Sequence, residues 1–174
     1  MINQYINIGV NIQELNKNLI FMAIEDDIKQ PKFKSEYNKL VVNILYTQSW
    51  LIEKQTSIFK PFGLTSPQYN VLRILRGQKG KPATINLIID RMLDRMSNAS
   101  RIVDRLERKE LVTRKQCPHD RRAVDVFISE KGLHLLAKID EKIDDWENNL
   151  SVISEEEAKN LNKLLDKLRE SNGS

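Results

Sequence analysis

The sequence predicts a mainly α-helical fold that carries one small β-hairpin, the arrangement of a winged helix-turn-helix. Six glycines and five prolines among 174 residues leave few helix breakers, and aromatic residues make up only 6%. Apolar residues recur at helical spacing along most of the chain. One central stretch instead shows two short alternating segments, which is typical of paired strands. The length suits one domain, or one small domain with an appendage.

The first 33 residues are expected to form an N-terminal extension. Residues 1–21 are rich in asparagine and only patchily apolar, and a charged segment follows Met22. Two interpretations remain open for this stretch. It is a loosely attached arm or start-site artefact, or it contains an extra helix at about 11–24.

A long helix is predicted from about residue 35 to residue 60. Its wide apolar stripe consists of Tyr37, Leu40, Val41, Ile44, Leu45, Leu51, Ile52, Ile58 and Phe59. Pro61 and Gly63 end it. A helix of this length needs more partner surface than one small domain offers, so we expect part of it to contact a second subunit.

Two helices with clear start signals follow. Thr65 and Gln68 have the spacing of a capping box, and Pro67 is tolerated in a first helical turn. A basic turn over 76–82 comes next, and Thr84 then caps a short helix over 85–92.

The next helix, over 97–109, has both an apolar stripe and a basic face. Ser97 is the expected N-cap. The stripe consists of Ala99, Ile102, Val103 and Leu106, and the basic face carries Ser97, Arg101, Arg105 and Arg108. Two short helices joined by a tight turn, the second amphipathic and basic, predict a helix-turn-helix.

A hairpin is predicted directly after this helix. Residues 112–115 and 123–128 alternate between apolar and polar side chains, and 117–122 would join them as a loop. We therefore assign a wing to residues 117–123.

Two helices close the chain. Ser129 caps the first, and Ser154 with three glutamates starts the second. Residues 130–170 hold seven Lys/Arg and eleven Asp/Glu, which makes them a poor DNA surface. We expect segments 35–60 and 130–170 to form a dimerisation region within a domain over 34–170, followed by a tail over 171–174.

The positive charge is concentrated in the middle of the chain. Residues 73–122 contain 14 Lys/Arg and 6 Asp/Glu, whereas the whole chain has a net charge of only +4. A basic segment within an acidic frame indicates a localised nucleic-acid surface, which we place in a lobe over 64–128.

Other classes of function find little support. A single cysteine excludes an internal disulfide, and His119 and His134 lack metal-ligand spacing. No nucleophile–base pair, phosphate loop or paired-acid motif is recognisable, so we predict no enzyme, metal or cofactor. No signal peptide or membrane span is recognisable, so we expect a cytoplasmic protein.

In their order, these parts resemble the MarR (multiple antibiotic resistance regulator) family of transcription factors. Three segments carry the resemblance within about 34–169: LTSPQYNVLRIL, SNASRIVDRLERKELVTR and DRRAVDVFISEKG. The resemblance implies an all-α homodimer with a small β-wing that binds pseudo-palindromic double-stranded operators. Members usually repress transcription and release DNA when a small ligand or an oxidant acts.

The resemblance also implies roles for individual residues. Ser97, Asn98, Ser100 and Arg101 match positions that face the major groove, and Arg122 matches a wing arginine that enters the minor groove. Asp120 matches an acid that holds wing and helix arginines, and Arg121 would reach phosphate or share that acid. The predicted DNA-binding set is Thr84, Ser97, Asn98, Ser100, Arg101, Arg105, Asp120, Arg121 and Arg122. Glu110 stands where the family usually has glycine, and a left-handed turn there would be strained.

Three questions remain open from the sequence. Tyr46, Trp50, Phe62 and Tyr69, with Phe59, either line a pocket for a small aromatic effector or pack in the core. Cys117 is either a redox-responsive thiol beside His119 or a plain strand-end residue. The alternative function is a winged-helix protein-interaction module that never binds DNA.

Overall fold

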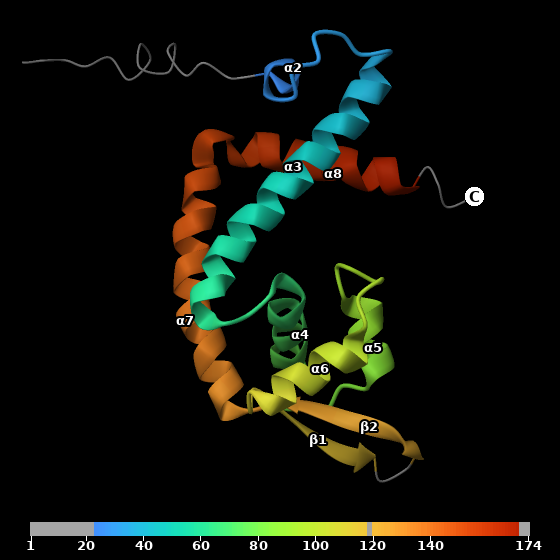
Figure 1. Cartoon of the computed structure of the whole chain (residues 1–174), viewed down its shortest axis with the longest axis vertical. Coiled ribbons are helices and arrows are strands. Elements are labelled where there is room, and N and C mark those ends of the chain that lie inside the picture. The colour runs from blue at the N-terminus through green and yellow to red at the C-terminus, as the bar shows by residue number, and fades with distance from the viewer. Residues whose placement is uncertain (1–22, 118–119, 171–174) are drawn as a thin grey trace, which may run out of the picture. The chain divides into compact units, whose positions relative to one another are not determined.

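The computed structural model describes residues 23–117 and 120–170, except for the side chains of Cys117 and residues 120–123. The chain divides into two compact units, one up to Trp50 and the other from Leu51 onward. The described residues are mostly helical and include one two-stranded antiparallel sheet, so the predicted fold class is confirmed (Figure 1). Residues 1–21, for which we left two interpretations open, lie outside the described part.

The first unit contains the short helix α2 (Ile24–Asp27) and the first half of α3 (Glu36–Phe59). Ile24 is buried, and Nζ of Lys39 lies 2.7 Å from the carboxylate of Glu25. The hydrogen bond from Lys39 holds the pKa of Glu25 below its usual value. This ion pair joins α2 to the beginning of the long helix.

The end of α3 enters the core of the second unit. Phe59 is fully buried and its ring stacks on Tyr69, with the two ring centroids 4.2 Å apart. A single 3-10 turn, η2 (Lys60–Phe62), follows, and Gly63 reverses the chain in the left-handed conformation at φ 67°. As predicted, a proline and a glycine end the long helix, since glycine adopts a positive φ at little cost.

Three helices of the second unit pack together above the hairpin: α4 (Ser66–Gly77), α5 (Ile85–Arg91) and α6 (Ala99–Arg108) (Figure 1). The capping box of α4 is confirmed, since Gln68 N donates to Oγ1 of Thr65 at 3.4 Å and Thr65 N donates to Oε1 of Gln68 at 3.2 Å. The fully buried side chains of this core are Phe59, Val71, Leu72, Leu75, Ile88, Val103, Leu106, Val112, Val126, Leu136 and Ile139.

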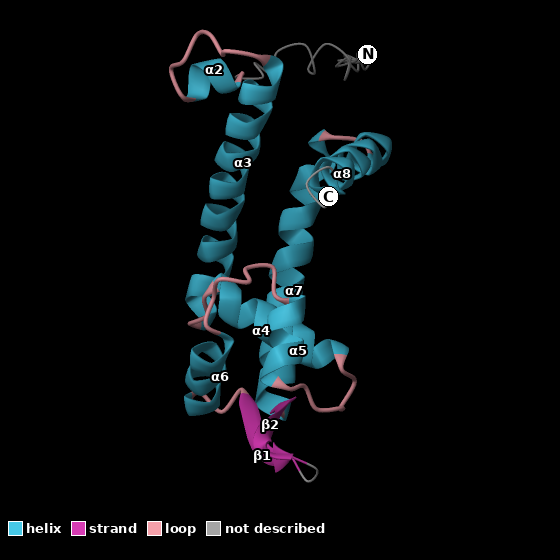
Figure 2. Ribbon diagram, turned by 90° about the vertical axis from the view of Figure 1, so that its right-hand side faces the viewer, coloured by secondary structure: helices cyan, strands magenta, loops and turns pink. Residues whose placement is uncertain are grey.

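The hairpin consists of β1 (Val112–Cys117) and β2 (Asp120–Ile128) (Figure 2). The predicted loop over 117–122 is wrong, because Cys117 ends β1 and pairs with Asp120 at the start of β2. A ladder needs only backbone groups, so it continues past the last alternating residues, with an irregularity in register after Gln116. The wing assigned to 117–123 therefore includes paired strand as well as the tip.

A short bridge that the sequence did not predict ties the basic turn to the hairpin. Ala83 N donates to the carbonyl oxygen of Val126 at 3.0 Å, and Val126 N donates to that of Ala83 at 2.9 Å. Thr84 follows at once as the N-cap of α5, with Oγ1 accepting from Leu87 N at 3.2 Å. This pairing positions α5 against the sheet.

The chain ends with α7 (Glu130–Asn148), the 3-10 turn η3 (Asn149–Val152) and α8 (Glu155–Glu170). Ser129 caps α7 as predicted, with Oγ accepting from Gly132 N at 3.0 Å. Gly132 lies so close to the hairpin base that an added Cβ would meet the Leu111 carbonyl oxygen at 2.4 Å. The guanidinium of Arg76 binds the carboxylate of Asp140 at 2.5 and 3.2 Å, which joins α4 to α7.

Large apolar side chains remain exposed on two helices. On α3 they are Tyr37, Leu40, Val41, Leu45, Tyr46, Trp50 and Ile52, and on α8 they are Leu161, Leu164 and Leu168. The predicted stripe of α3 is therefore buried only at its C-terminal end, where Phe59 enters the core.

Candidate nucleic-acid interface

The N-cap of the basic helix α6 lies one residue later than the sequence suggested. Asn98, and not Ser97, is its N-cap, because Oδ1 of Asn98 accepts from Arg101 N at 3.0 Å. The hydroxyl of Ser97 instead donates to the carboxylate of Asp94 at 2.6 Å. The predicted span 97–109 is corrected to Ala99–Arg108.

Side chains fix the turn between α5 and α6. Asp94 also accepts from Met96 N at 3.0 Å, and the hydrogen bond from Ser97 lowers the pKa of this carboxyl. Leu93 N donates to Oδ1 of Asn70 on α4 at 3.1 Å. The helix-turn-helix therefore presents the first turn of α6 from a turn whose backbone is pinned at two residues.

One face of α6 packs in the core and the opposite face is open to solvent. Ala99, Val103 and Leu106 are buried, and the solvent-exposed residues from the cap onward are Asn98, Ser100, Arg101, Arg105, Glu107 and Arg108. Within the described residues, no hydrogen bond or ion pair engages the three exposed guanidinium groups. Of the four predicted major-groove residues, Asn98, Ser100 and Arg101 are thus exposed, whereas Ser97 is half-buried.

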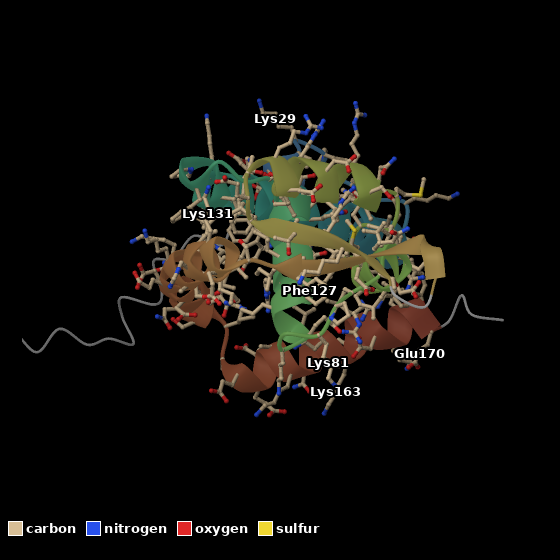
Figure 3. The ribbon with its side chains drawn as sticks, turned by 90° about the horizontal axis from the view of Figure 1, so that it is seen from below. Lys29, Lys81, Phe127, Lys131, Lys163 and Glu170 are labelled. Carbon is tan, nitrogen blue, oxygen red and sulfur yellow. The ribbon has the colours of Figure 1, made fainter. Side chains whose placement is uncertain are left out.

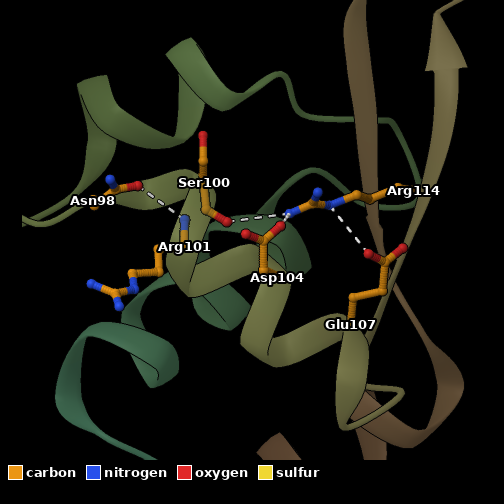
Figure 4. A network of polar contacts seen from close by, with 6 residues as sticks. All are labelled: Asn98, Ser100, Arg101, Asp104, Glu107 and Arg114. Carbon is orange, nitrogen blue, oxygen red and sulfur yellow. Dashed lines mark hydrogen bonds and ion pairs between the residues drawn. The ribbon is translucent and has the colours of Figure 1, made fainter.

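The acids of α6 lie on its side toward the hairpin, where Arg114 of β1 meets them (Figure 4). The guanidinium of Arg114 pairs with Asp104, and its Nε lies 3.5 Å from the carboxylate of Glu107. Nη2 also donates to the carbonyl oxygen of Ser100 at 3.2 Å. Figure 4 shows the side chain of Arg101 pointing away from this cluster.

This cluster was not predicted from the sequence, although its signal was present. Asp104 and Glu107 are three apart, which places them on one helix face. Val112 and Arg114 are two apart and so share one face of their strand, and Val112 is buried. An arginine on the inward face of a strand needs an acidic partner, and α6 supplies two.

The wing residues are described only in part. Asp120, Arg121 and Arg122 lie in β2, but their side chains are outside the described part of the structure, as are Pro118 and His119. The roles given to these residues, and to the Cys117 thiol, therefore stay predictions.

Further cations of the basic lobe are exposed. Lys79, Lys81 and Arg95 are open to solvent, and Nζ of Lys115 lies 5.5 Å from the ring centroid of Phe127 on the outer face of the hairpin. Figure 3 shows Phe127 on the hairpin, with Lys81 and Lys131 extending outward. Cations therefore extend over the turn before α5, over α6 and over the hairpin.

Comparison with known proteins decides the family. A model of the MarR family matches residues 62–123, which is the segment from the end of η2 through α6 into β2. The HTH-type transcriptional regulator MhqR of Bacillus subtilis is 35% identical over 114 residues, which are 61% of this chain and 72% of MhqR.

The chain belongs to the MarR family.

Solved structures of other proteins share the fold. The organohalide-sensing regulator RdhR-CbdbA1625, in its 2,4-dichlorophenol-bound form, matches with a TM-score of 0.73 and 22% identity over 82% of this chain and 85% of that one. MepR of S. aureus in its DNA-binding conformation matches with a TM-score of 0.64 and 23% identity over 76% of this chain and 97% of that one. Membership of the MarR family makes the protein a DNA-binding winged-helix transcriptional regulator, as the sequence predicted.

The aromatic residues that we assigned to an effector pocket have unequal surroundings in this MarR-family chain. Tyr69 is only 8% exposed and packs on Phe59, and burial raises the pKa of its hydroxyl. Phe62 is half-buried against the same core, whereas Tyr46 and Trp50 are 42% and 40% exposed. Core packing accounts for Tyr69, and an effector site remains a prediction.

In the part of the chain that the structure describes, no three His, Cys, Asp or Glu side chains form a group that could hold a metal ion. Among the described helices, none combines the length and the apolar character needed to cross a membrane.

Proposed function

We propose that the protein acts as a homodimeric repressor that binds pseudo-palindromic duplex operators, with α6 in the major groove and the hairpin tip in the minor groove. One observation carries the proposal. The exposed face of α6 presents short polar groups at its first turn and, after them, three guanidinium groups for which the described residues supply no hydrogen bond or ion pair, while Arg114 engages two of the helix acids.

The chemistry of this face suits base recognition. Arg101 can bind the O6 and N7 atoms of guanine through two hydrogen bonds, a pairing that contributes roughly 1–3 kcal/mol of discrimination. Asn98 and Ser100 are short enough for the helix to approach base edges, and Ser97 lies beside the free N–H groups that favour phosphate. Arg105, one turn further along, and Thr84, at the start of α5, would contact the DNA backbone.

The hairpin supplies the second part of the proposed contact. Arg122 would enter the minor groove, where narrow A·T tracts attract a cation. Asp120 would hold the arginines of wing and helix, and Arg121 would reach phosphate or share that acid.

The dimer is supported by apolar side chains that are exposed on α8. Leu161, Leu164 and Leu168 lie at helical spacing on α8, and Leu164 is 63% exposed. A run of exposed apolar residues is typical of an interaction surface. The acidic character of residues 130–170 makes a second protein subunit a better partner for it than DNA.

The test begins with selection of bound genomic fragments to identify an operator. Fluorescence anisotropy then compares the operator with a scrambled duplex. Arg101→Ala should lower operator affinity by roughly tenfold and leave scrambled affinity nearly unchanged. Arg122→Ala should weaken both complexes, and Lys163→Ala on α8 should change neither.

Two results would count against this proposal. If Arg101→Ala and Arg122→Ala bind both the operator and the scrambled duplex as tightly as wild type, the assignment of those residues is refuted. Little affinity of the wild-type protein for any duplex at low salt would favour the alternative, a winged-helix module that binds protein only.

The effector is proposed to be a small aromatic compound. The support is the fold shared with a regulator crystallised with 2,4-dichlorophenol, together with the exposed rings of Tyr46 and Trp50. A thermal-shift screen of phenols and aromatic acids should find a compound that raises Tm and releases operator DNA. A screen without such a compound would remove the support for this effector class.

A further inference from the structure

The contacts of Arg114 point to a role that the DNA-reading residues do not account for. We propose that Arg114 is a positioning residue that sets the orientation of α6 against the hairpin and so makes major-groove reading specific. This inference rests on the proposed function, because it assigns specificity to a residue that touches neither base nor phosphate.

Arg114 contacts α6 at three points. Arg114 contacts three successive positions along one side of α6: the carbonyl oxygen of Ser100, the carboxylate of Asp104 and the carboxylate of Glu107. These positions span two turns of a helix of ten residues. A planar guanidinium that binds three points along a rod restricts both its sliding and its rotation, which a single point contact does not.

One of these contacts lies in the first turn of α6, at Ser100. Ser100 lies between Ala99, which is buried, and Arg101, which is exposed. Its carbonyl oxygen receives the Arg114 hydrogen bond, so the backbone that carries the predicted reading residues is held from the hairpin side. A shift of this turn would displace Asn98 and Arg101 together, since the Asn98 side chain caps the Arg101 amide.

Arg114 also offsets the negative charge on α6. Asp104 and Glu107 are the only acids within α6, and without a partner they would repel the phosphates that approach the same helix. Arg114 is 26% exposed and engaged with both. It therefore contributes by cancelling repulsion and by orienting the helix, and is not itself available to a phosphate.

Arg114 and its neighbour Lys115 have different surroundings on β1. Lys115 lies on the opposite face of β1, over the ring of Phe127. A change at Lys115 removes the same charge from the same strand without touching α6. Lys115→Gln is therefore the matched control for Arg114→Gln.

The experiment measures operator and scrambled-duplex affinity for wild type, Arg114→Gln, Lys115→Gln and the triple variant Asp104→Asn/Glu107→Gln/Arg114→Gln. Arg114→Gln should reduce the ratio of operator affinity to scrambled-duplex affinity by roughly tenfold. That is about the discrimination contributed by one arginine–guanine contact. Lys115→Gln should weaken both complexes together and leave the ratio unchanged. The triple variant has no unpaired acid on α6, so it should regain scrambled-duplex affinity but not the ratio.

Recovery of the ratio in the triple variant would overturn the positioning role, because charge cancellation alone would then explain the effect. An unchanged ratio in Arg114→Gln would overturn it too. A wild-type protein that binds the operator no more tightly than the scrambled duplex would instead refute the proposed function.

Hydrogen–deuterium exchange decides the positioning role without DNA. Arg114→Gln should raise exchange in peptides covering 97–108 and 112–117, while peptides from α7 remain as in wild type. Unchanged exchange in α6, or an equal rise throughout the chain, would contradict a positioning role.

Discussion

Glu110 shows how a single residue carries a cost that its neighbours offset. It adopts the left-handed conformation at φ 62°, which side chains other than glycine disfavour. Its carbonyl oxygen accepts from Oγ of Ser129 at 2.7 Å, and its carboxylate lies 2.6 Å from Nζ of Lys131. The strain was predicted from the sequence, because glycine usually occupies this position in the family, but the two bonds to the start of α7 were not.

Glu110→Gly should raise Tm by roughly 2–4 °C at neutral pH, because glycine relieves the left-handed strain. Glu110→Ala is the control: it keeps the strain, loses the ion pair and should lower Tm. Calorimetry on the three proteins measures both effects. A lower Tm for the glycine variant would show that the ion pair between Glu110 and Lys131 outweighs the strain.

The pH dependence of this difference has a definite sign. The hydrogen bond from Lys131 lowers the pKa of Glu110, so the stabilisation by this pair is present above the unfolded-state pKa and is lost as pH falls through the lower folded-state pKa. The advantage of the glycine variant in Tm should therefore be larger at about pH 3.5 than at pH 7. An advantage that shrinks in acid would contradict this linkage.

At the scale of elements, patterns along the sequence were enough to predict most helices and their starts. Thr65, Thr84 and Ser129 act as the caps that the sequence indicated, because each precedes an apolar-periodic run. Ser97 and Asn98 are both good caps, and Asp94 decides between them by binding the serine hydroxyl. The contacts of Arg114 and the Ala83–Val126 bridge join segments distant in sequence, so no local pattern contains them.

The cap of α6 can be separated from its proposed contact with DNA. Asn98→Asp keeps an oxygen acceptor for Arg101 N and should change the free energy of unfolding by less than about 0.5 kcal/mol. It adds a negative charge at the proposed DNA surface and should weaken operator binding by roughly tenfold or more. Asn98→Ala should cost about 1 kcal/mol of stability through loss of the cap.

Urea denaturation and anisotropy together test these variants. Tight operator binding by the aspartate variant would show that the start of α6 does not face DNA.

For the molecule as a whole, the sequence predicted which surfaces are basic and which are apolar better than it predicted what covers them. The basic lobe and the acidic C-terminal helices follow directly from residue counts. The exposure of Leu161, Leu164 and Leu168 needed the structure, because helical periodicity does not tell an internal core from an interface between subunits.

Leu164→Glu should dissociate the proposed dimer. Two copies of the leucine would leave an apolar interface, which should raise the dissociation constant by roughly a hundredfold or more. Asn162→Glu adds the same charge on the other side of α8 and should leave the dimer intact. Light scattering over a concentration series measures the mass, and equal masses for the leucine variant and wild type would exclude α8 from the interface.

Lys109, the residue after α6, donates from Nζ to the carbonyl oxygen of Gly63, 46 positions earlier in the chain. The same ammonium group lies 3.5 Å from Oε1 of Gln68, which is buried at the start of α4. A reagent that acetylates lysines would therefore do more than remove a charge at this position. Acetylation would uncouple the last turn of α6 from the corner where the chain leaves α3. Because the Lys109 amine is hydrogen-bonded, it should react more slowly with the reagent than the exposed amines of Lys79 and Lys81.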